Sequence, residues 1–250
     1  MDVEAYLRRI EYRGPLRRDF ETLRQLHLSH LLRVPFENLS IHAREPIVLD
    51  DTALFEKIVT RRRGGFCYEL NGLFGRLLRE LGFEVAMLSA EVANDSGDFS
   101  REFDHMTLKV RLNEQLWLAD IGFGDSFIEP LLLNGTEHQQ REYRYRVVST
   151  SGERFLLARA ASDGVWKPQY RFSLQPHPYI DYAEMCSYHQ TSPDSHFTRQ
   201  RICSLLTPQG RISLSDMRLI VTENGVRSER LVSSGQEYSE ILRNVFGIVM

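Results

Sequence analysis

A short segment around Cys67 constrains this chain more than any other part of it. Residues 61–72 read Arg-Arg-Arg-Gly-Gly-Phe-Cys-Tyr-Glu-Leu-Asn-Gly. After Cys67, apolar residues recur at the i, i+3, i+4, i+7 spacing of a half-buried helix, which Gly82 ends. These positions are Leu70, Leu73, Phe74, Leu77, Leu78 and Leu81. The spacing therefore predicts a helix that begins at Cys67 and packs one face against a core.

A cysteine at the start of a helix is expected to be reactive. Unpaired N–H groups and the positive end of the helix dipole favour an anion there, so we expect Cys67 to be partly thiolate and nucleophilic. Gly64 and Gly65 are expected to adopt backbone angles closed to other residues. They are also expected to leave space beside the sulfur for a second reactant.

Two predicted strands downstream carry a histidine and an aspartate. Apolar and polar residues alternate from His105, and residues 115–124 continue Gln-Leu-Trp-Leu-Ala-Asp-Ile-Gly-Phe-Gly, which predicts an antiparallel hairpin. If the two-residue turn begins at Leu112, His105 lies directly opposite Asp120; if it begins one residue later, the two are diagonal neighbours. Either register leaves both side chains on one face, about 5 to 8 Å apart and able to meet.

Cys67, His105 and Asp120 together make a chemically complete catalytic set. A thiol nucleophile needs a base that takes its proton, and the base needs a carboxylate that fixes its tautomer and stabilises its cation. The sequence therefore predicts nucleophilic catalysis through Cys67.

At these residues the chain resembles the arylamine N-acetyltransferase family, in which an Arg-Gly-Gly-x-Cys element carries the acyl group. The resemblance spans nearly the whole chain. Its segments are Leu26-His27 with His30, residues 34–39, residues 63–71, His105, residues 120–124, residues 190–193, Ser195, Phe197 and residues 203–205. Phe103 and Asp104 stand where many bacterial relatives have Pro-Arg-Thr, so we expect a different pocket wall there.

The resemblance implies ping-pong acyl transfer with acetyl-CoA as co-substrate and no metal. Cys67 is expected to hold the acetyl group, and an arylamine, arylhydrazine or N-hydroxyarylamine to receive it. His105 is expected to move the protons and Asp120 to orient it. The resemblance also implies that Arg63 pairs with Glu37 inside the protein and holds the turn that carries Cys67.

Residues that contact the substrates are expected around this set. Backbone N–H groups of Phe66, Cys67 and residues 103–106 are candidates for stabilising the oxyanion. The side chains expected to contact the acceptor are Phe36, Phe66, Met106, Phe123 and Phe197. Gly122, Phe123 and Gly124 are expected along the CoA chain.

The periodicities predict an α+β fold with three regions. Residues 1–82 read as a helical bundle that carries the nucleophile, residues 83–188 as a β-barrel that carries histidine and aspartate, and residues 189–250 as an α/β lid. Turns are expected at Asn134-Gly135 and Ser151-Gly152, and a closing helix over 238–245. The resemblance implies a cysteine-protease-like catalytic core. Because nucleophile and base lie on different regions, the active site is expected at their junction.

Composition excludes several other classes of protein. With a formal net charge of −3, the chain lacks the broad positive field that binding to nucleic acids requires. No window reaches the eighteen apolar residues of a membrane span. Three cysteines and the lack of a recognisable export segment predict a reducing cytoplasm. A monomer or small homo-oligomer is expected. Cys186 and His189 have zinc-like spacing but lack a second pair of ligands, so no metal is expected. His27 and His30, one helical turn apart, are expected to be structural residues.

Three alternatives to arylamine acetylation share parts of this pattern. An amide synthase of the same fold would form a macrolactam from a polyketide acyl donor. A cysteine hydrolase would use the same three residues, with water as the acceptor. A non-catalytic ligand-binding relative is the third, and the intact set of Cys67, His105 and Asp120 argues against it.

Overall fold

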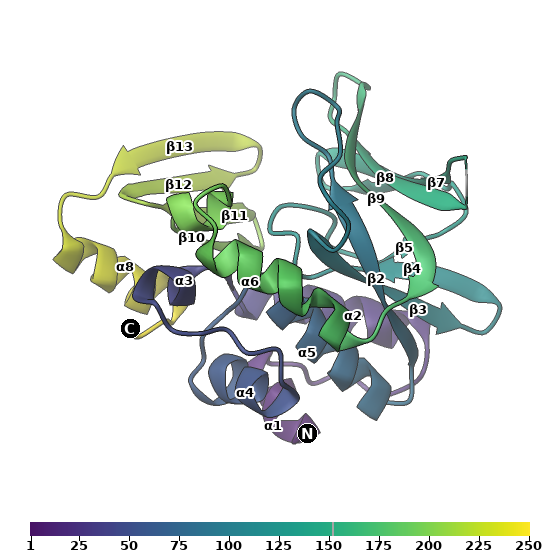
Figure 1. The fold of residues 1–250 in the computed structure, drawn as a ribbon, viewed down its shortest axis with the longest axis horizontal. Helices are drawn as coiled ribbons and strands as arrows, with labels where there is room; N and C mark the ends of the chain where they lie inside the picture. Colours follow the sequence, from purple (N-terminus) through teal and green to yellow (C-terminus); the bar gives the residue numbers. More distant parts are fainter. Residues whose placement is uncertain (152) are drawn as a thin grey trace.

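The computed structural model describes residues 1–151 and 153–250 and confirms the α+β fold class (Figure 1). Helices α1, α4 and α5 lie together on one side of the molecule, and two sheets rise from them in Figure 1. The helices are α1 (Val3–Arg9), α2 (Phe20–Arg33), α3 (Leu39–Ala43), α4 (Asp51–Phe55), α5 (Cys67–Glu80), α6 (Ala183–Thr191), α7 (His196–Arg199) and α8 (Gly235–Phe246). A π-helical turn, Glu56–Thr60, follows α4, and a 3-10 turn, Tyr179–Tyr182, precedes α6.

Helix α5 begins at Cys67, as the apolar spacing predicts. Phe66 precedes its first turn, and the Glu69 carboxylate accepts the Phe66 backbone N–H at 3.1 Å. The helix ends at Glu80, and Gly82, which follows the cap residue Leu81, is left-handed with φ +85°. Its apolar face packs into a core shared with the first two helices and with the strand that carries His105.

Eight strands form a nearly closed, barrel-like sheet in the order β5-β4-β3-β2-β9-β8-β7-β6. They are β2 (Glu84–Val92), β3 (His105–Leu112), β4 (Gln115–Ala119), β5 (Leu131–Leu132), β6 (His138–Gln140), β7 (Tyr143–Ser149), β8 (Arg154–Ala160) and β9 (Trp166–Pro176). Leu112 pairs with Gln115, so the turn of the β3–β4 hairpin begins at Asn113. This is the second of the two predicted registers, and it makes His105 and Asp120 diagonal neighbours. The turn at Asn134-Gly135 is present, with φ +84° at Gly135, whereas the one at Ser151-Gly152 includes the one position outside the described residues.

A second sheet of five strands takes its first strand from the N-terminal part of the chain. Its order is β1 (Phe36–Glu37), β10 (Ile202–Thr207), β11 (Gly210–Ser215), β12 (Arg218–Glu223) and β13 (Val226–Leu231). Phe36 pairs with Ser204, and α8 covers the sheet through Leu242 and Phe246. Helix α6 crosses the boundary expected between residues 188 and 189, so the three regions remain a proposed division.

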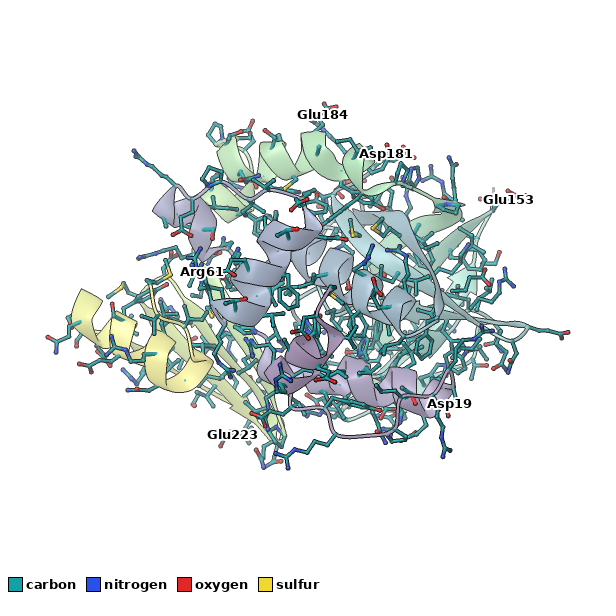
Figure 2. All side chains as sticks on the ribbon, turned by 90° about the horizontal axis from the view of Figure 1, so that it is seen from below. Asp19, Arg61, Glu153, Asp181, Glu184 and Glu223 are labelled. Atoms are coloured by element: carbon teal, nitrogen blue, oxygen red, sulfur yellow. The ribbon has the colours of Figure 1, made fainter. Side chains whose placement is uncertain are left out.

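Charged side chains lie at the periphery of the molecule, as Asp19, Glu184 and Glu223 show in Figure 2. Arg61 and Arg62 are exposed, whereas Arg63 next to them is buried. Among the described residues, no helix combines the length and apolar character needed to cross a membrane.

Candidate active site

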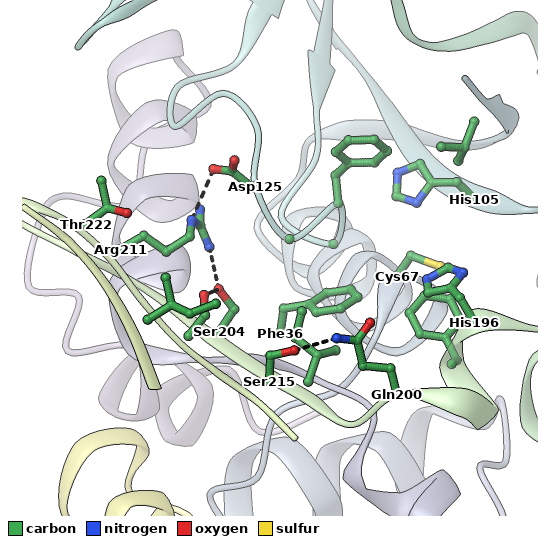
Figure 3. Close-up of a pocket in the computed structure, with 18 of the residues that line it drawn as sticks. Phe36, Cys67, His105, Asp125, His196, Gln200, Ser204, Arg211, Ser215 and Thr222 are labelled. Atoms are coloured by element: carbon green, nitrogen blue, oxygen red, sulfur yellow. Dashed lines mark hydrogen bonds and ion pairs between the residues drawn. The ribbon is translucent and has the colours of Figure 1, made fainter. Parts of the chain in front are cut away.

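His105 and Asp120 meet by a hydrogen bond of 2.7 Å between Nε2 and Oδ2. Cys67 and His105 line the same pocket, one at the start of α5 and the other at the start of β3 (Figure 3). Because Asp120 occupies Nε2, the other ring nitrogen, Nδ1, is the one left to receive the thiol proton. The structure thus brings the three predicted residues into one site at the junction of the helices and the barrel.

Other side chains surround the Asp120 carboxylate with hydrogen-bond donors. Asn71 donates to Oδ1 at 2.8 Å, the backbone of Gly122 to Oδ1 at 2.9 Å and the Tyr170 hydroxyl to Oδ2 at 2.8 Å. Although burial opposes ionisation, His105, Asn71 and Gly122 bring the pKa of Asp120 below its usual range. The carboxylate is therefore ionised and fixed, which holds the imidazole in one orientation.

His27 supports the same residue through the main chain. Its Nε2 accepts the backbone N–H of Asp120 at 3.1 Å, and its Nδ1 lies 3.0 Å from the Ile128 carbonyl. Burial lowers the pKa of His27 to about 4, so it is neutral and its Nδ1–H donates to that carbonyl. This is the structural role that the sequence predicts for His27.

The burial of Cys67 opposes the partly thiolate state that the sequence predicts. Burial raises the pKa of the thiol well above its usual range, and the Asp104 and Asp120 carboxylates raise it further. The Met106 backbone N–H points at the sulfur and opposes this shift. Desolvation outweighs the helix terminus here, so a base such as His105 is needed to remove the thiol proton.

Gly64 and Gly65 serve a purpose different from the predicted one. Neither has a positive φ; a Cβ on Gly64 would lie 2.0 Å from the Pro35 carbonyl oxygen, and one on Gly65 would lie 2.8 Å from Cβ of Glu69. The Gly65 carbonyl accepts the Glu37 N–H at 2.8 Å. Gly64 therefore lets the loop before Cys67 dock against the backbone that leads into β1, whereas Gly65 leaves room for the Glu69 side chain. The closest neighbours of both positions are thus Pro35 and Glu69, and not the sulfur.

Arg63 pairs with Glu37, as the resemblance implies. Its Nη2 lies 2.9 Å and its Nε 3.1 Å from Oε1 of Glu37, and both side chains are buried. The second oxygen of Glu37 accepts the Leu39 N–H at 2.6 Å. Arg9 of α1 reinforces the loop by donating to the carbonyl of Arg63 at 3.3 Å. The loop is thereby tied to both α1 and β1.

The pocket at Cys67 has a volume of about 520 Å³ and two chemically different regions. Phe36, Phe123 and Phe197 form an aromatic region near the nucleophile. The other region is polar and belongs to the C-terminal sheet; its lining residues are Ser204, Arg211, Ser213, Ser215, Thr222 and Arg227. Arg211 lies 3.2 Å from Oδ1 of Asp125, and Phe36 separates it from Cys67 in Figure 3. Gly122 and Gly124 also line the pocket.

Two residues predicted to contact the acceptor do not line this pocket. Phe66 and Met106 are fully buried. Phe66 packs behind Phe197, with ring centroids 5.6 Å apart, and Met106 offers its backbone N–H to Cys67. The apolar pattern alone could not separate a pocket wall from the core directly behind it.

Several of the expected oxyanion donors are already used within the protein. The N–H of Phe66 donates to Glu69, that of Phe103 to Ser89 at 2.7 Å and that of Asp104 to the Arg101 carbonyl at 3.3 Å. The N–H of Cys67, in the first turn of α5, has no acceptor within the helix itself.

The zinc-like spacing of Cys186 and His189 does not bring them to a metal centre. His189 instead bonds Ser195, and Cys186 is buried beside Gln190. Among residues 1–151 and 153–250, no group of three or more His, Cys, Asp or Glu side chains is arranged to hold a metal ion.

Asn71 and Tyr170 are site residues whose roles the sequence analysis missed. Asn71 follows Cys67 by one helical turn, so the helix spacing could have placed it below the nucleophile. Tyr170 lies on β9, a strand without a clear alternating pattern, and no local signal connects it to Asp120.

Comparisons with known proteins agree with this geometry. A sequence model of the family described as N-acetyltransferase matches residues 19–250. The human arylamine N-acetyltransferase 1 is 34% identical over 99% of this chain and 94% of its own length. Proansamycin X synthase of Amycolatopsis mediterranei is 30% identical over 98% of this chain and 96% of its own.

A solved relative has the same fold. The structure of the Mycobacterium marinum arylamine N-acetyltransferase in complex with CoA superposes with a TM-score of 0.91 at 31% identity, covering 99% of this chain and 93% of that one. Helix-borne cysteine and strand-borne histidine thus meet in the cysteine-protease-like manner that the resemblance implies. The chain belongs to the arylamine N-acetyltransferase family.

Proposed function

We propose that the protein transfers an acetyl group from acetyl-CoA to the nitrogen of arylamines and arylhydrazines, and to the oxygen of N-hydroxyarylamines, through an acetyl thioester on Cys67. The observation that carries the proposal is the placement of Cys67 and the His105–Asp120 pair at a pocket with both an aromatic region and a polar region that contains two arginines. Family membership supports the same activity.

The first half-reaction loads the cysteine. His105 takes the thiol proton, the sulfur attacks the thioester carbonyl carbon of acetyl-CoA, and the tetrahedral oxyanion collapses. The CoA sulfur leaves with the proton returned by His105. Asp120, held by Asn71 and Tyr170, stabilises the imidazolium during this exchange. The Cys67 N–H is the donor we assign to the oxyanion.

The pocket suggests where each substrate lies. The phosphates of acetyl-CoA suit the region around Arg211 and Arg227, since guanidinium groups bind phosphate oxygens well. Gly122 lies against Cα of Cys67 and Gly124 lies against the Phe36 ring. The backbone of these two residues therefore lines the side of the pocket along which the CoA chain would run from that region to the thiol. An aryl ring can stack on Phe36, Phe123 or Phe197.

Intact mass spectrometry tests the proposal directly. Mixing the protein with acetyl-CoA alone is expected to add one acetyl group, which Cys67→Ala abolishes and an arylamine discharges. The proposal fails if the mass stays unchanged and no CoA is released. CoA release without an adduct would indicate hydrolysis.

The second candidate is amide synthesis from a longer acyl donor. The similarity to proansamycin X synthase favours it, because that relative matches nearly the whole chain. This candidate predicts that acetyl-CoA leaves Cys67 unmodified while an activated polyketide thioester acylates it. The same mass measurement with both donors separates the two functions.

A further inference from the structure

A second histidine–aspartate pair lies beside the catalytic one. Nδ1 of His189 is 3.1 Å from the Ser195 hydroxyl, and its Nε2 is 3.2 Å from Oδ1 of Asp104. Asp104 directly precedes His105 and lines the same pocket as Cys67. The acyl-transfer chemistry proposed above does not use this pair.

Ser195, which contacts the other ring nitrogen of His189, cannot act as a nucleophile. Ser195 is 3% exposed, and its hydroxyl accepts the Phe197 N–H at 3.2 Å as the N-cap of α7. The Asp104 side chain, by contrast, keeps 22% of its surface exposed. Any contact with a substrate therefore occurs at Asp104.

His189 lies beside the Asp104 carboxylate and is itself held in a fixed position. The aromatic rings of Phe66, Tyr68 and Phe197 surround the imidazole, with centroids 6.4, 6.1 and 5.1 Å away. The Tyr68 hydroxyl also donates to the Phe103 carbonyl at 2.6 Å and fixes the loop that carries Asp104. A carboxylate fixed in this way needs little reorganisation to stabilise a charge that develops nearby.

Asp104 is ionised and close to the reacting sulfur. Burial opposes its ionisation, yet the nearby His189, Ser100 and His105 bring its pKa below the usual range. Its negative charge also raises the pKa of the Cys67 thiol, next in importance after burial among the effects that raise it. The Asp104 carboxylate therefore disfavours the thiolate form of Cys67. Activation of the nucleophile is thus not its role.

We propose that Asp104, oriented by His189, recognises the attacking nitrogen of the acceptor and stabilises its positive charge. This inference rests on the proposed acyl-transfer function. When the amine attacks acetyl-Cys67, the nitrogen lone pair forms the bond to the carbonyl carbon and the π electrons move to oxygen. The nitrogen then carries a positive charge until one of its protons passes to His105. The C–S bond breaks, and the Cys67 sulfur leaves with that proton.

Asp104 remains ionised through all these steps and accepts an N–H hydrogen bond from the acceptor. The loading half-reaction places no positive charge on the attacking or leaving atom, since both are sulfur. Stabilisation of the attacking atom by Asp104 is thus specific to discharge by amines and hydrazines. During loading, the Asp104 charge disfavours the Cys67 thiolate but favours the His105 imidazolium, so its two effects oppose one another.

The test separates the two half-reactions in Asp104→Asn. Loading is followed by CoA release in a stopped-flow burst, and discharge by mixing isolated acetyl-enzyme with an arylhydrazine. We expect discharge to slow by at least about tenfold, the worth of a charge-assisted hydrogen bond, and loading to stay within about threefold of wild type. Glu102→Gln is the matched control, because Glu102 lies two residues away with a 66% exposed side chain. It should change neither rate.

Discharge by dithiothreitol provides a readout that a structural role would not move. A thiolate attacks without gaining positive charge and is repelled by the Asp104 carboxylate, so Asp104→Asn should leave this rate unchanged or raise it. His189→Gln, which loosens the carboxylate without removing it, should reduce hydrazine discharge by a smaller factor. Equal slowing of loading, hydrazine discharge and dithiothreitol discharge would overturn the inference, as would unchanged hydrazine discharge. If wild-type protein forms no acetyl-enzyme, the proposed function itself fails and this inference with it.

Discussion

Asp120 contacts His105 at 2.7 Å even though the hairpin register makes the two residues diagonal neighbours. Asp120 follows the last residue of β4, Ala119, where the ladder of strand pairs ends. There Asn71 and Tyr170 reach the carboxylate from outside the hairpin. Residues of α5, β3 and β9 therefore together fix the position of His105.

Asp120→Asn is expected to lower the rate of loading by two to four orders of magnitude, roughly the scale of lost imidazole orientation. The asparagine amide would present N–H groups where Asn71, Gly122 and Tyr170 already donate. The free energy of unfolding should fall by about 2 to 4 kcal/mol for the same reason. Burst kinetics and urea unfolding measure the two effects, and a wild-type burst rate would contradict the assigned role.

The depressed pKa of Asp120 also predicts how stability varies with pH. In the unfolded chain its carboxyl takes up a proton near the usual value of 3.8, while in the folded protein it stays ionised to lower pH. Its contribution is therefore present above the unfolded pKa and lost as pH falls through the folded pKa. Unfolding free energy measured from pH 6 downward should decline less steeply in Asp120→Asn than in wild type. Parallel curves would show that Asp120 does not contribute to acid sensitivity.

Cys67→Ala should abolish loading and leave the fold intact. The side chain is 3% exposed and lies between the pocket and the core, so the lost sulfur costs about 1 kcal/mol or less in packing. The change also removes the thiol on which loading depends. Loss of the acetyl adduct with a nearly unchanged melting temperature is the expected pair of results. An adduct that persists in the variant would assign the acetyl group to another residue.

Local patterns in the sequence were sufficient for the parts of the site that local structure controls. The apolar spacing after Cys67 predicted the start of α5, and strict alternation predicted the β3–β4 hairpin. Both signals arise within one element or one turn, where periodicity directly reports the buried face. The three residues that we propose to be catalytic could be found for that reason.

Features that depend on distant packing could not be predicted in the same way. Tyr170 reaches Asp120 from a strand that contains Pro168 and a register shift, which obscure its alternation. Gly64 is required because of the Pro35 carbonyl, which lies far away in sequence, and the raised pKa of Cys67 comes from burial in the assembled fold. The predicted start of α5 and the presence of two glycines could not reveal the Gly64 contact or the raised pKa of Cys67. Both arise only after β1 docks beside the loop that precedes Cys67.

The glycine pair offers a test of this docking. In Gly64→Ala the new methyl would lie 2.0 Å from the Pro35 carbonyl oxygen, and because backbone lies on both sides neither can yield cheaply. We expect a loss of at least about 3 kcal/mol in unfolding free energy. Gly75→Ala is the matched control on α5: its methyl meets only the end of the Leu108 side chain at 3.3 Å, and alanine favours a helix. That variant should stay within about 1 kcal/mol of wild type, so equal stability of the two variants would show that the approach of Gly64 to β1 does not hold the loop.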